Sequence, residues 1–265
     1  MESKHKMEGE YIMEEDDIFK NINGLPSKLY RPHISGKFDF YSGKNKNHEN
    51  NFIIEVDGSA YYNCLDPKSK TDCHRYYLEL KITNVKNDNT LVVLMLNPSN
   101  TSPAEGDEKA KIDETVKNAV RVAYKAGYSA VIIINTFSYI DGNSSTAVKS
   151  AKEDQKNINI EIIKNVLEKN KELLIAWGGK VLKKDKSKIL KEISQKYKNL
   201  KIYAYDWSYK SNNPYHLSSI VNNKITNFPI TKFLTNKTGE NKLLPLKITN
   251  KNEKYYLELV SQNSK

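Results

Sequence analysis

The sequence has 265 residues and a formal net charge of +10, from 42 lysines and arginines against 32 acidic residues. A chain of this length buries enough surface for a hydrophobic core, and no apolar run approaches the length that spans a membrane. Only two cysteines occur, Cys64 and Cys73. They exclude a disulfide framework and, with a polar first segment unlike a signal peptide, favour a cytoplasmic protein with reduced thiols. The positive charge suits a polyanionic partner such as nucleic acid, and a lysine-rich surface that is merely solvated explains it equally well.

The N-terminal part of the chain is expected to be rich in β-structure. Residues 1–20 are expected to form a flexible acidic tail, and residues 21–88 a β-rich region packed on the core. The pieces that indicate strands are KFDFY, NFIIEV and RYYLELKIT. The polar stretches between them indicate turns and loops.

Residues 89–235 alternate apolar strands with amphipathic helices. The predicted strands are TLVVLML, SAVIIIN, ELLIAW and LKIYAYDW. The predicted helices between them are DETVKNAVRVAYKA, KEDQKNINIEIIKNVLEKN and KVLKKDKSKILKEISQKY. This alternation indicates an α/β fold, a three-layer α/β/α arrangement with a central four-stranded parallel sheet. Ligands bind such sheets beyond the carboxyl ends of the strands, so the residues that follow the strands are the candidates for a site.

Residues 236–265 are expected to add a C-terminal β-hairpin. The segment KLLPLKITNKNEKYYLELVSQ contains two extended pieces around a polar turn at residues 250–253. Alternating apolar residues on both sides of such a turn are typical of a hairpin.

Short polar motifs follow the four core strands: LNPS, INTFSY, AWGGKVLKK and, after the last strand, NPYHLSSI. In this order, the sequence from Leu91 to Leu234 resembles the uracil-DNA glycosylase superfamily. In that superfamily a strand ends in Asp or Asn followed by Pro, a later strand ends in a base-reading Asn, and a histidine motif closes the series. With a later Asp-x-Thr at Asp113 and Thr115, the pattern is most similar to the branch named DUF1643.

The resemblance implies hydrolysis of the N-glycosidic bond of a pyrimidine that is flipped out of the DNA stack. This chemistry needs a water at the sugar carbon and hydrogen-bond donors for the charge on the departing base. By the resemblance, Asn97 matches the water-positioning residue and His216 the donor to the base carbonyl, and these two are the candidate catalytic residues. The candidate base- and substrate-binding residues are Leu96, Pro98, Ser99, Asn135, Phe137, Asp113 and Trp177. The candidate DNA-binding residues are Ser218, Ile220, Lys180, Lys183 and Lys184.

Several of these positions depart from the family pattern or have a simpler structural explanation. Leu217 stands where the motif has proline. Ser99 stands where the uracil-specific branch has tyrosine, which leaves room for a 5-modified base. An Asn before a proline, like Asn97, also suits a loop fixed by side-chain bonds to the backbone. An Asp at a helix start, like Asp113, suits the helix dipole, and the lysines of residues 180–201 suit a solvated helix face.

The sequence has no Walker A loop, no GxGxxG after a strand, no GxSxG elbow and no standard zinc spacing, so no metal or cofactor is expected. Three functional hypotheses follow. The first is a DNA glycosylase that acts on a damaged pyrimidine or on a 5-modified base in foreign (phage) DNA. The second is a catalytically silent nucleic-acid-binding protein of the same fold, and the third is an enzyme that acts on free nucleotides.

Overall fold

Four apolar segments form the parallel centre of the sheet. They are β6 (Thr90–Met95), β7 (Ala130–Asn135), β8 (Glu172–Ile175) and β9 (Lys201–Ala204). Their order across the sheet is β7-β6-β8-β9, and each neighbouring pair is parallel. The computed structural model describes residues 10–12, 17–27, 29–40, 53–66, 71–98, 111–141, 152–208, 211–218 and 243–260. The predicted α/β class and the parallel arrangement of these four strands agree with it.

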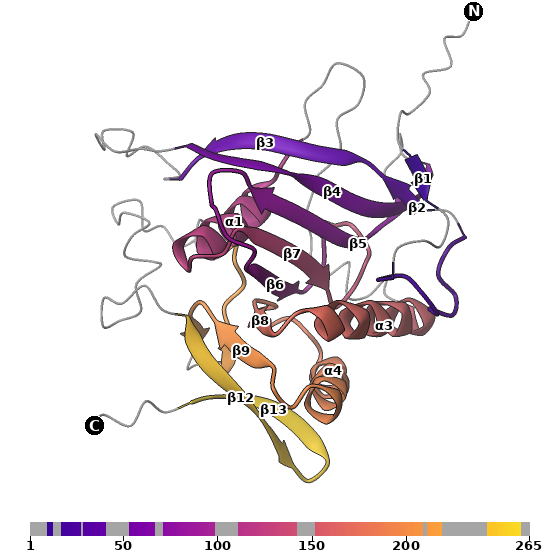
Figure 1. Cartoon of the computed structure of the whole chain (residues 1–265). Helices are drawn as coiled ribbons and strands as arrows, with labels where there is room; N and C mark the ends of the chain where they lie inside the picture. Colours follow the sequence, from indigo (N-terminus) through magenta and orange to yellow (C-terminus); the bar gives the residue numbers. More distant parts are fainter. Residues whose placement is uncertain are drawn as a thin grey trace, which may run out of the picture.

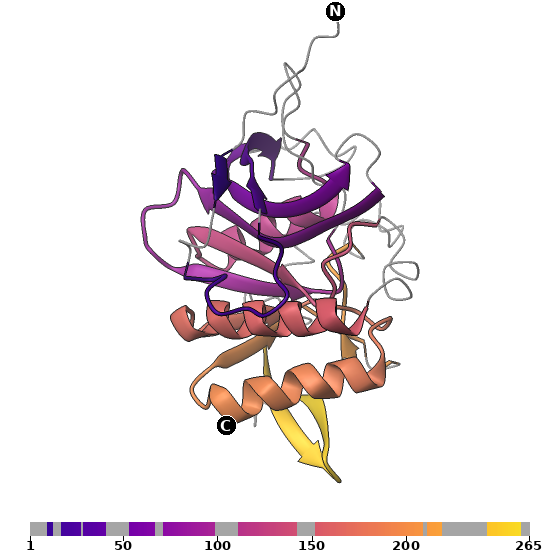
Figure 2. The ribbon, with the colours of Figure 1, turned by 90° about the vertical axis from the view of Figure 1, so that its right-hand side faces the viewer.

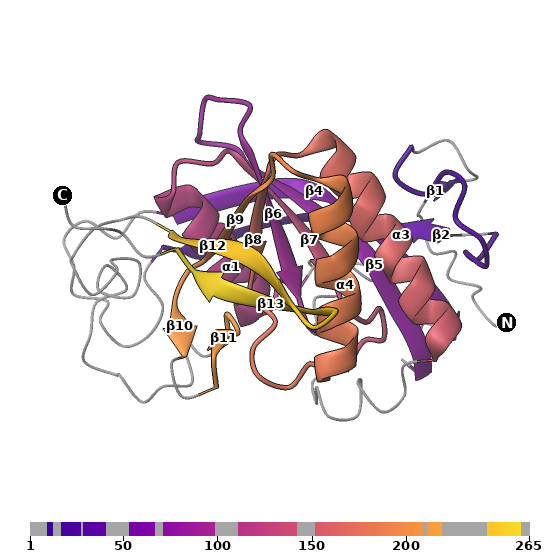
Figure 3. The same ribbon diagram turned by 90° about the horizontal axis from the view of Figure 1, so that it is seen from below.

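Three helices cover the two faces of these strands in the part of the chain that the structure describes. They are α1 (Glu114–Lys125), α3 (Glu153–Lys169) and α4 (Lys183–Lys196). Helix α1 lies on one face, and α3 and α4 lie side by side on the other (Figures 2 and 3). Because β7 and β8 lie on opposite sides of β6 and parallel crossovers are right-handed, the helices after β6 and β7 must lie on opposite faces.

Antiparallel strands extend this sheet at both edges (Figure 1). On the β7 side these are β5 (Thr71–Ile82), β4 (Ile53–Asp66), β3 (His33–Asp39), β2 (Leu29–Arg31) and β1 (Glu10–Ile12). On the β9 side they are β12 (Leu244–Lys251) and β13 (Lys254–Leu259). The N-terminal and C-terminal additions thus continue one sheet, which has eleven strands among the described residues. They pair the backbone groups that β7 and β9 would otherwise expose as edge strands.

Parts of the segment that was expected to be a flexible tail have a defined place. Strand β1 pairs with β2, and Phe19 is buried in the hydrophobic cluster beneath α3. The Asn165 side chain of α3 also donates a hydrogen bond to the carbonyl oxygen of Ile18, at 2.9 Å. The acidic charge of this segment predicts a flexible tail and does not reveal that Ile18 and Phe19 pack into the hydrophobic cluster.

The expectation of reduced thiols differs from the structure at the β4–β5 hairpin. Cys73 is disulfide-bonded, and the register of the two antiparallel strands sets Cys64 directly opposite it. Two cysteines can form a disulfide where antiparallel pairing brings their backbones close together. The spacing of the cysteines in the sequence does not show this pairing. Among the helices of the described residues, none is long and apolar enough to cross a membrane.

The strand order places a topological switch point between β6 and β8. From β6 the chain moves to β7 on one side, and it then returns to β8 on the other side. At such a point the loops after the two strands diverge and leave a crevice, in which open α/β sheets bind their ligands. A small ribbon of β10 (Trp207–Ser208) and β11 (Asn213–Pro214) follows β9 and leads the chain to His216.

Candidate functional site

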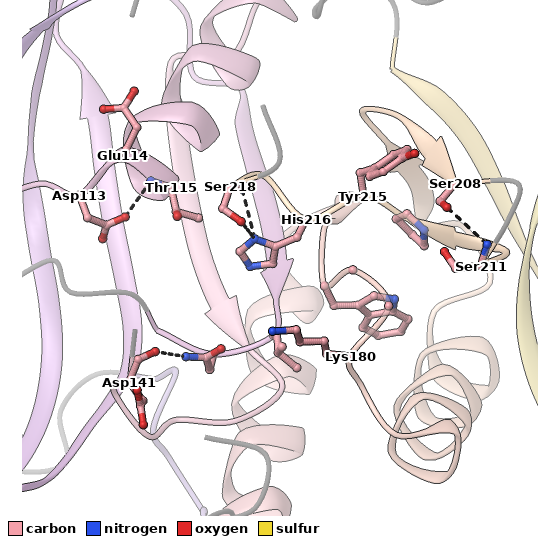
Figure 4. A pocket seen from close by; sticks show the side chains of 16 residues that line it. Asp113, Glu114, Thr115, Asp141, Lys180, Ser208, Ser211, Tyr215, His216 and Ser218 are labelled. Atoms are coloured by element: carbon pink, nitrogen blue, oxygen red, sulfur yellow. Dashed lines mark hydrogen bonds between the residues drawn. The ribbon is translucent and has the colours of Figure 1, made fainter. Parts of the chain in front are cut away.

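A cavity of about 520 Å³ lies at this switch point (Figure 4). Its volume is in the range of cavities that hold small-molecule ligands. The predicted site residues that line it are Leu96, Asn97, Asp113, Trp177, Lys180, His216 and Ser218. They come from the loops after β6 and β8, from the start of α1 and from the segment after β11. The fold therefore brings together motifs that are more than a hundred residues apart in the sequence.

Asn97 is held by its own side chain at the end of β6. Its Nδ2 donates one hydrogen bond to the carbonyl oxygen of Asp141 (2.7 Å) and one to that of Pro98 (3.0 Å). Both amide donors are thus used to fix the loop, as expected for an Asn before a proline. The same two bonds determine the orientation of the amide, so that its oxygen is the group available to accept a hydrogen bond from a ligand or water.

His216 is partly buried, and the loss of solvent around its imidazole lowers its pKa to about 4; the charge of Asp113 opposes this shift and that of Lys180 adds to it. The ring is therefore neutral near pH 7. Nδ1 accepts a hydrogen bond from the Ser218 backbone N–H (3.2 Å) and lies 2.7 Å from the Ser218 hydroxyl oxygen (Figure 4). Because Nδ1 is the acceptor in this arrangement, the proton of the neutral ring is assigned to Nε2, which becomes a hydrogen-bond donor.

The segment around His216 is fixed by contacts on both sides. The Asn118 side chain donates to the carbonyl oxygen of Leu217 (3.2 Å), and Leu217 is fully buried in the cluster on the α1 face. Gly178, with φ +69°, packs so closely that a Cβ atom there would lie 3.1 Å from the Cβ of His216. Leu217 therefore anchors the loop at the position where the resembling motif has proline.

Three carboxylate residues line the cavity. Asp113 is the N-cap of α1, and its Oδ1 accepts hydrogen bonds from the backbone N–H groups of Thr115 (2.8 Å) and Val116 (3.2 Å). Glu114 forms an ion pair with Arg121. Figure 4 shows Asp113 and Asp141 on one side of the cavity and Tyr215 on the other, with His216 between them. The position at a helix start that the sequence indicated for Asp113 is thus that of the N-cap, and the residue also lines the site.

The lysines near the site divide into two groups. Lys180 lines the cavity, whereas Lys183 and Lys184 are exposed at the start of α4 and do not line it. Further along α4, Lys188 lies 3.1 Å from a carboxylate oxygen of Glu153. Lys196 forms an ion pair with Glu168 of α3. Part of the positive charge of α4 is therefore neutralised by α3.

Lys186 connects α4 to the β10–β11 ribbon. Its Nζ donates to Oδ1 of Asn213 (2.5 Å), one residue before the cavity-lining Pro214. Burial lowers the pKa of Lys186 to about 8, and the charge of Lys183 adds to the effect. Lys186 thus holds the ribbon that leads to His216.

Other predicted site residues lie elsewhere. Asn135 is only 2% exposed and does not line the cavity, and neither amide atom of its side chain has a hydrogen-bond partner. Phe137 is buried in the core with the ammonium of Lys156 over its ring. Pro98 is buried and contributes its carbonyl to Asn97. Ser99 and Ile220 fall outside the described residues.

Thr115 of the Asp-x-Thr motif also lines the cavity, together with residues that the sequence prediction missed: Glu114, Asp141, Gly178, Gly179, Ser208, Ser211, Pro214 and Tyr215. Most of them are chain neighbours of predicted residues, so a wider reading of the AWGG and NPYH motifs would include them. No local pattern marks Asp141 or Ser208, which only the tertiary structure brings to the site.

The donor set of the cavity is suited to a polar organic ligand. Trp177 lines it with its indole ring, and His216 and Lys180 add N–H donors to the same cavity. Within the described ranges, no group of three or more His, Cys, Asp or Glu side chains is arranged to hold a metal ion.

Comparison with known proteins shows a weak structural likeness and a match to a protein family. A solved structure from Bacteroides fragilis NCTC 9343, titled "putative acetyl xylan esterase", aligns with 9% sequence identity and a TM-score of 0.32. The alignment covers 76% of this chain and 59% of that one, and so spans less than two thirds of that protein's length; a likeness this weak carries no argument about fold or function. No curated protein matches the sequence.

The model of one family, described as "Protein of unknown function (DUF1643)", matches residues 75–216. This region contains β6 to β11 and all of the cavity-lining residues except Ser218, and because it spans more than half of the sequence, the chain belongs to the DUF1643 family.

Proposed function

We propose that this protein is a DNA glycosylase-like enzyme that hydrolyses the N-glycosidic bond of a flipped-out pyrimidine. The observation that carries the proposal is the convergence of Asn97, Trp177 and His216 on one cavity at the switch point of the sheet. These are the residues by which the sequence resembles the uracil-DNA glycosylase superfamily. The net charge of +10 supports a polyanionic substrate.

The chemistry of the two candidate catalytic groups supports the same reaction. The oxygen of Asn97 is oriented to accept a hydrogen bond from a water that attacks the sugar carbon. A neutral His216 with its proton on Nε2 donates to a base carbonyl, and this bond strengthens as the departing base gains negative charge. A neutral imidazole is effective for this purpose because it stabilises the anion without first protonating it.

The test is an abasic-site assay. Purified protein is incubated with duplex and single-stranded oligonucleotides that carry uracil, thymine opposite guanine, 5-hydroxymethylcytosine or glucosylated cytosine, and the products are cleaved with alkali. We expect strand breaks with one of these bases, and we expect Asn97→Ala and His216→Ala to abolish them while duplex affinity is retained. Strand breaks that persist in both variants, or none with the wild-type protein on any substrate, contradict the proposal.

The second candidate is a catalytically silent nucleic-acid-binding protein. It is favoured by Asn135, the residue that the resemblance makes the base reader, because its side chain is buried away from the cavity. A silent binder would hold DNA with strong salt dependence, would produce no abasic sites, and would be indifferent to Asn97→Ala.

A further inference from the structure

Asn97 is poorly suited to remove a proton from an attacking water. A carboxamide is not a base near neutral pH, and both N–H groups of this one are bonded to the carbonyl oxygens of Asp141 and Pro98. The amide oxygen can orient a water, but the proton that the water loses on attack needs another acceptor. The acceptor must lie in the same cavity.

Asp113 is the carboxylate whose placement meets this requirement. It lines the cavity with Asn97 and His216, and its charge acts on the imidazole of His216. The two backbone N–H bonds from the first turn of α1 hold one carboxylate oxygen in place. A carboxylate has about four acceptor positions, so Asp113 can cap the helix and accept a hydrogen bond from a water as well.

The other two carboxylates of the cavity are used differently. Glu114 is bound by the guanidinium of Arg121 and lies 3.7 Å from the ammonium of Lys117. Asp141 contributes its backbone carbonyl to Asn97, and Figure 4 shows its carboxylate pointing away from His216. Trp177 lines the same cavity with its indole ring.

From this geometry we infer that Asp113 is the general base of the reaction. The inference rests on the proposed function. Asn97 orients a water, and Asp113 accepts one of its protons as the water oxygen bonds to C1′ of the sugar. The C1′–N bond breaks, its electron pair stays on the base nitrogen, and His216 Nε2–H hydrogen-bonds the base carbonyl that carries the charge. The proton on Asp113 then passes to the released base or to solvent, which restores the carboxylate.

The test separates this role from helix capping. Asn caps helices as well as Asp does, so Asp113→Asn keeps the cap and removes only the base. We expect the single-turnover excision rate of Asp113→Asn to fall by about a hundredfold or more, the range of general-base catalysis, with an unchanged melting temperature and duplex affinity. The matched control is Asp154→Asn, an exposed Asp in the first turn of α3, which should excise at the wild-type rate.

Two further variants keep the test decisive if Asp113→Asn does not fold. Asp113→Glu retains a carboxylate and should recover part of the rate, and added formate should raise the rate of Asp113→Ser, a variant that also caps the helix. A wild-type rate in Asp113→Asn, or no response of Asp113→Ser to formate, overturns the inference and leaves the proposed function standing. A wild-type protein that excises no base overturns both, so the two failures are distinguishable.

Discussion

At the scale of single residues, the site depends on how each polar atom is already used. Asn97 uses both of its donors on backbone carbonyls, and Nδ1 of His216 faces Ser218. Besides these bonds, Asn97 carries an acceptor, its amide oxygen, and His216 carries a donor, its Nε2–H, and both residues line the cavity. Structural and functional explanations for these residues are therefore compatible, since the bonds that fix a side chain also determine which atom it offers to a ligand.

The neutral state of His216 predicts a pH-dependent loss of stability. Its pKa falls from 6.5 to about 4 on folding, mainly because of burial. The unfolded chain therefore binds a proton between pH 6.5 and 4 that the folded protein does not bind, and stability is lost as the pH falls through this window. The part of the unfolding free energy that is due to His216 is fully present above pH 6.5, and about 3 kcal/mol of it is lost at pH 4.

Urea denaturation at several pH values measures this contribution. Because a glutamine side chain does not titrate, the His216→Gln variant should lack this part of the pH dependence of stability. We thus expect the difference in unfolding free energy between wild type and variant to change by about 3 kcal/mol between pH 7 and pH 4. A difference that stays constant over this range would show that folding does not lower the pKa of His216.

At the scale of elements, the loop after β8 and the segment after β11 form one unit. Gly178 needs a positive φ and also leaves space for His216. The Tyr205 hydroxyl, just after β9, donates to the carbonyl oxygen of His216 (3.3 Å). The AWGG motif thus contributes to the site through close packing as well as through the indole of Trp177.

Replacing Gly178 separates these two requirements. Gly178→Ala combines a strained φ with a Cβ at 3.1 Å from His216, and we expect a loss of about 1–3 kcal/mol in unfolding free energy together with a shift in the NMR signals of the His216 ring. Gly127→Ala has a similar φ of +85° and no atom within 4 Å of the added Cβ, so it should reproduce only the loss of stability. Gly179→Ala also meets no atom and should change neither quantity.

At the scale of the whole molecule, one sheet connects both ends of the described chain. Strand β12 pairs with β9, and Leu257 of β13 is buried in the same cluster as α3 and α4. The C-terminal hairpin is thus part of the core of the molecule. It also completes the edge of the sheet beside the strand that leads to β10 and His216.

This arrangement predicts that damage to the hairpin destabilises the entire protein. Leu257 is 6% exposed, whereas the neighbouring Tyr256 is 41% exposed. We expect Leu257→Ala to lower the unfolding free energy by about 2–4 kcal/mol and Tyr256→Ala to have an effect below about 0.5 kcal/mol. Thermal melts followed by far-UV and near-UV circular dichroism should shift together. A hairpin that melts separately in Leu257→Ala would contradict a shared core.

Local sequence determined the elements of the core. The apolar runs from TLVVLML to LKIYAYDW contain β6, β7, β8 and β9. The amphipathic spacing gave the three helices to within a few residues, because burial on one or two faces imposes a period that is visible in a single segment. The turn of the last hairpin was expected at residues 250–253, and in the structure Asn252 and Glu253 form its two-residue loop. Both have positive φ, as in a type I′ turn.

Long-range pairing and side-chain packing decided the rest. No local period reveals that β5 joins β7 or that β12 joins β9, since these strand partners lie about 40 to 55 residues apart in the chain. The sequence likewise could not show that Asn135 turns into the core while Asp141 reaches Asn97. The sequence by itself determined which residues stand at the carboxyl ends of the strands. Only the tertiary structure decided which of them share the cavity, because that depends on strand order and on the contacts that orient each side chain.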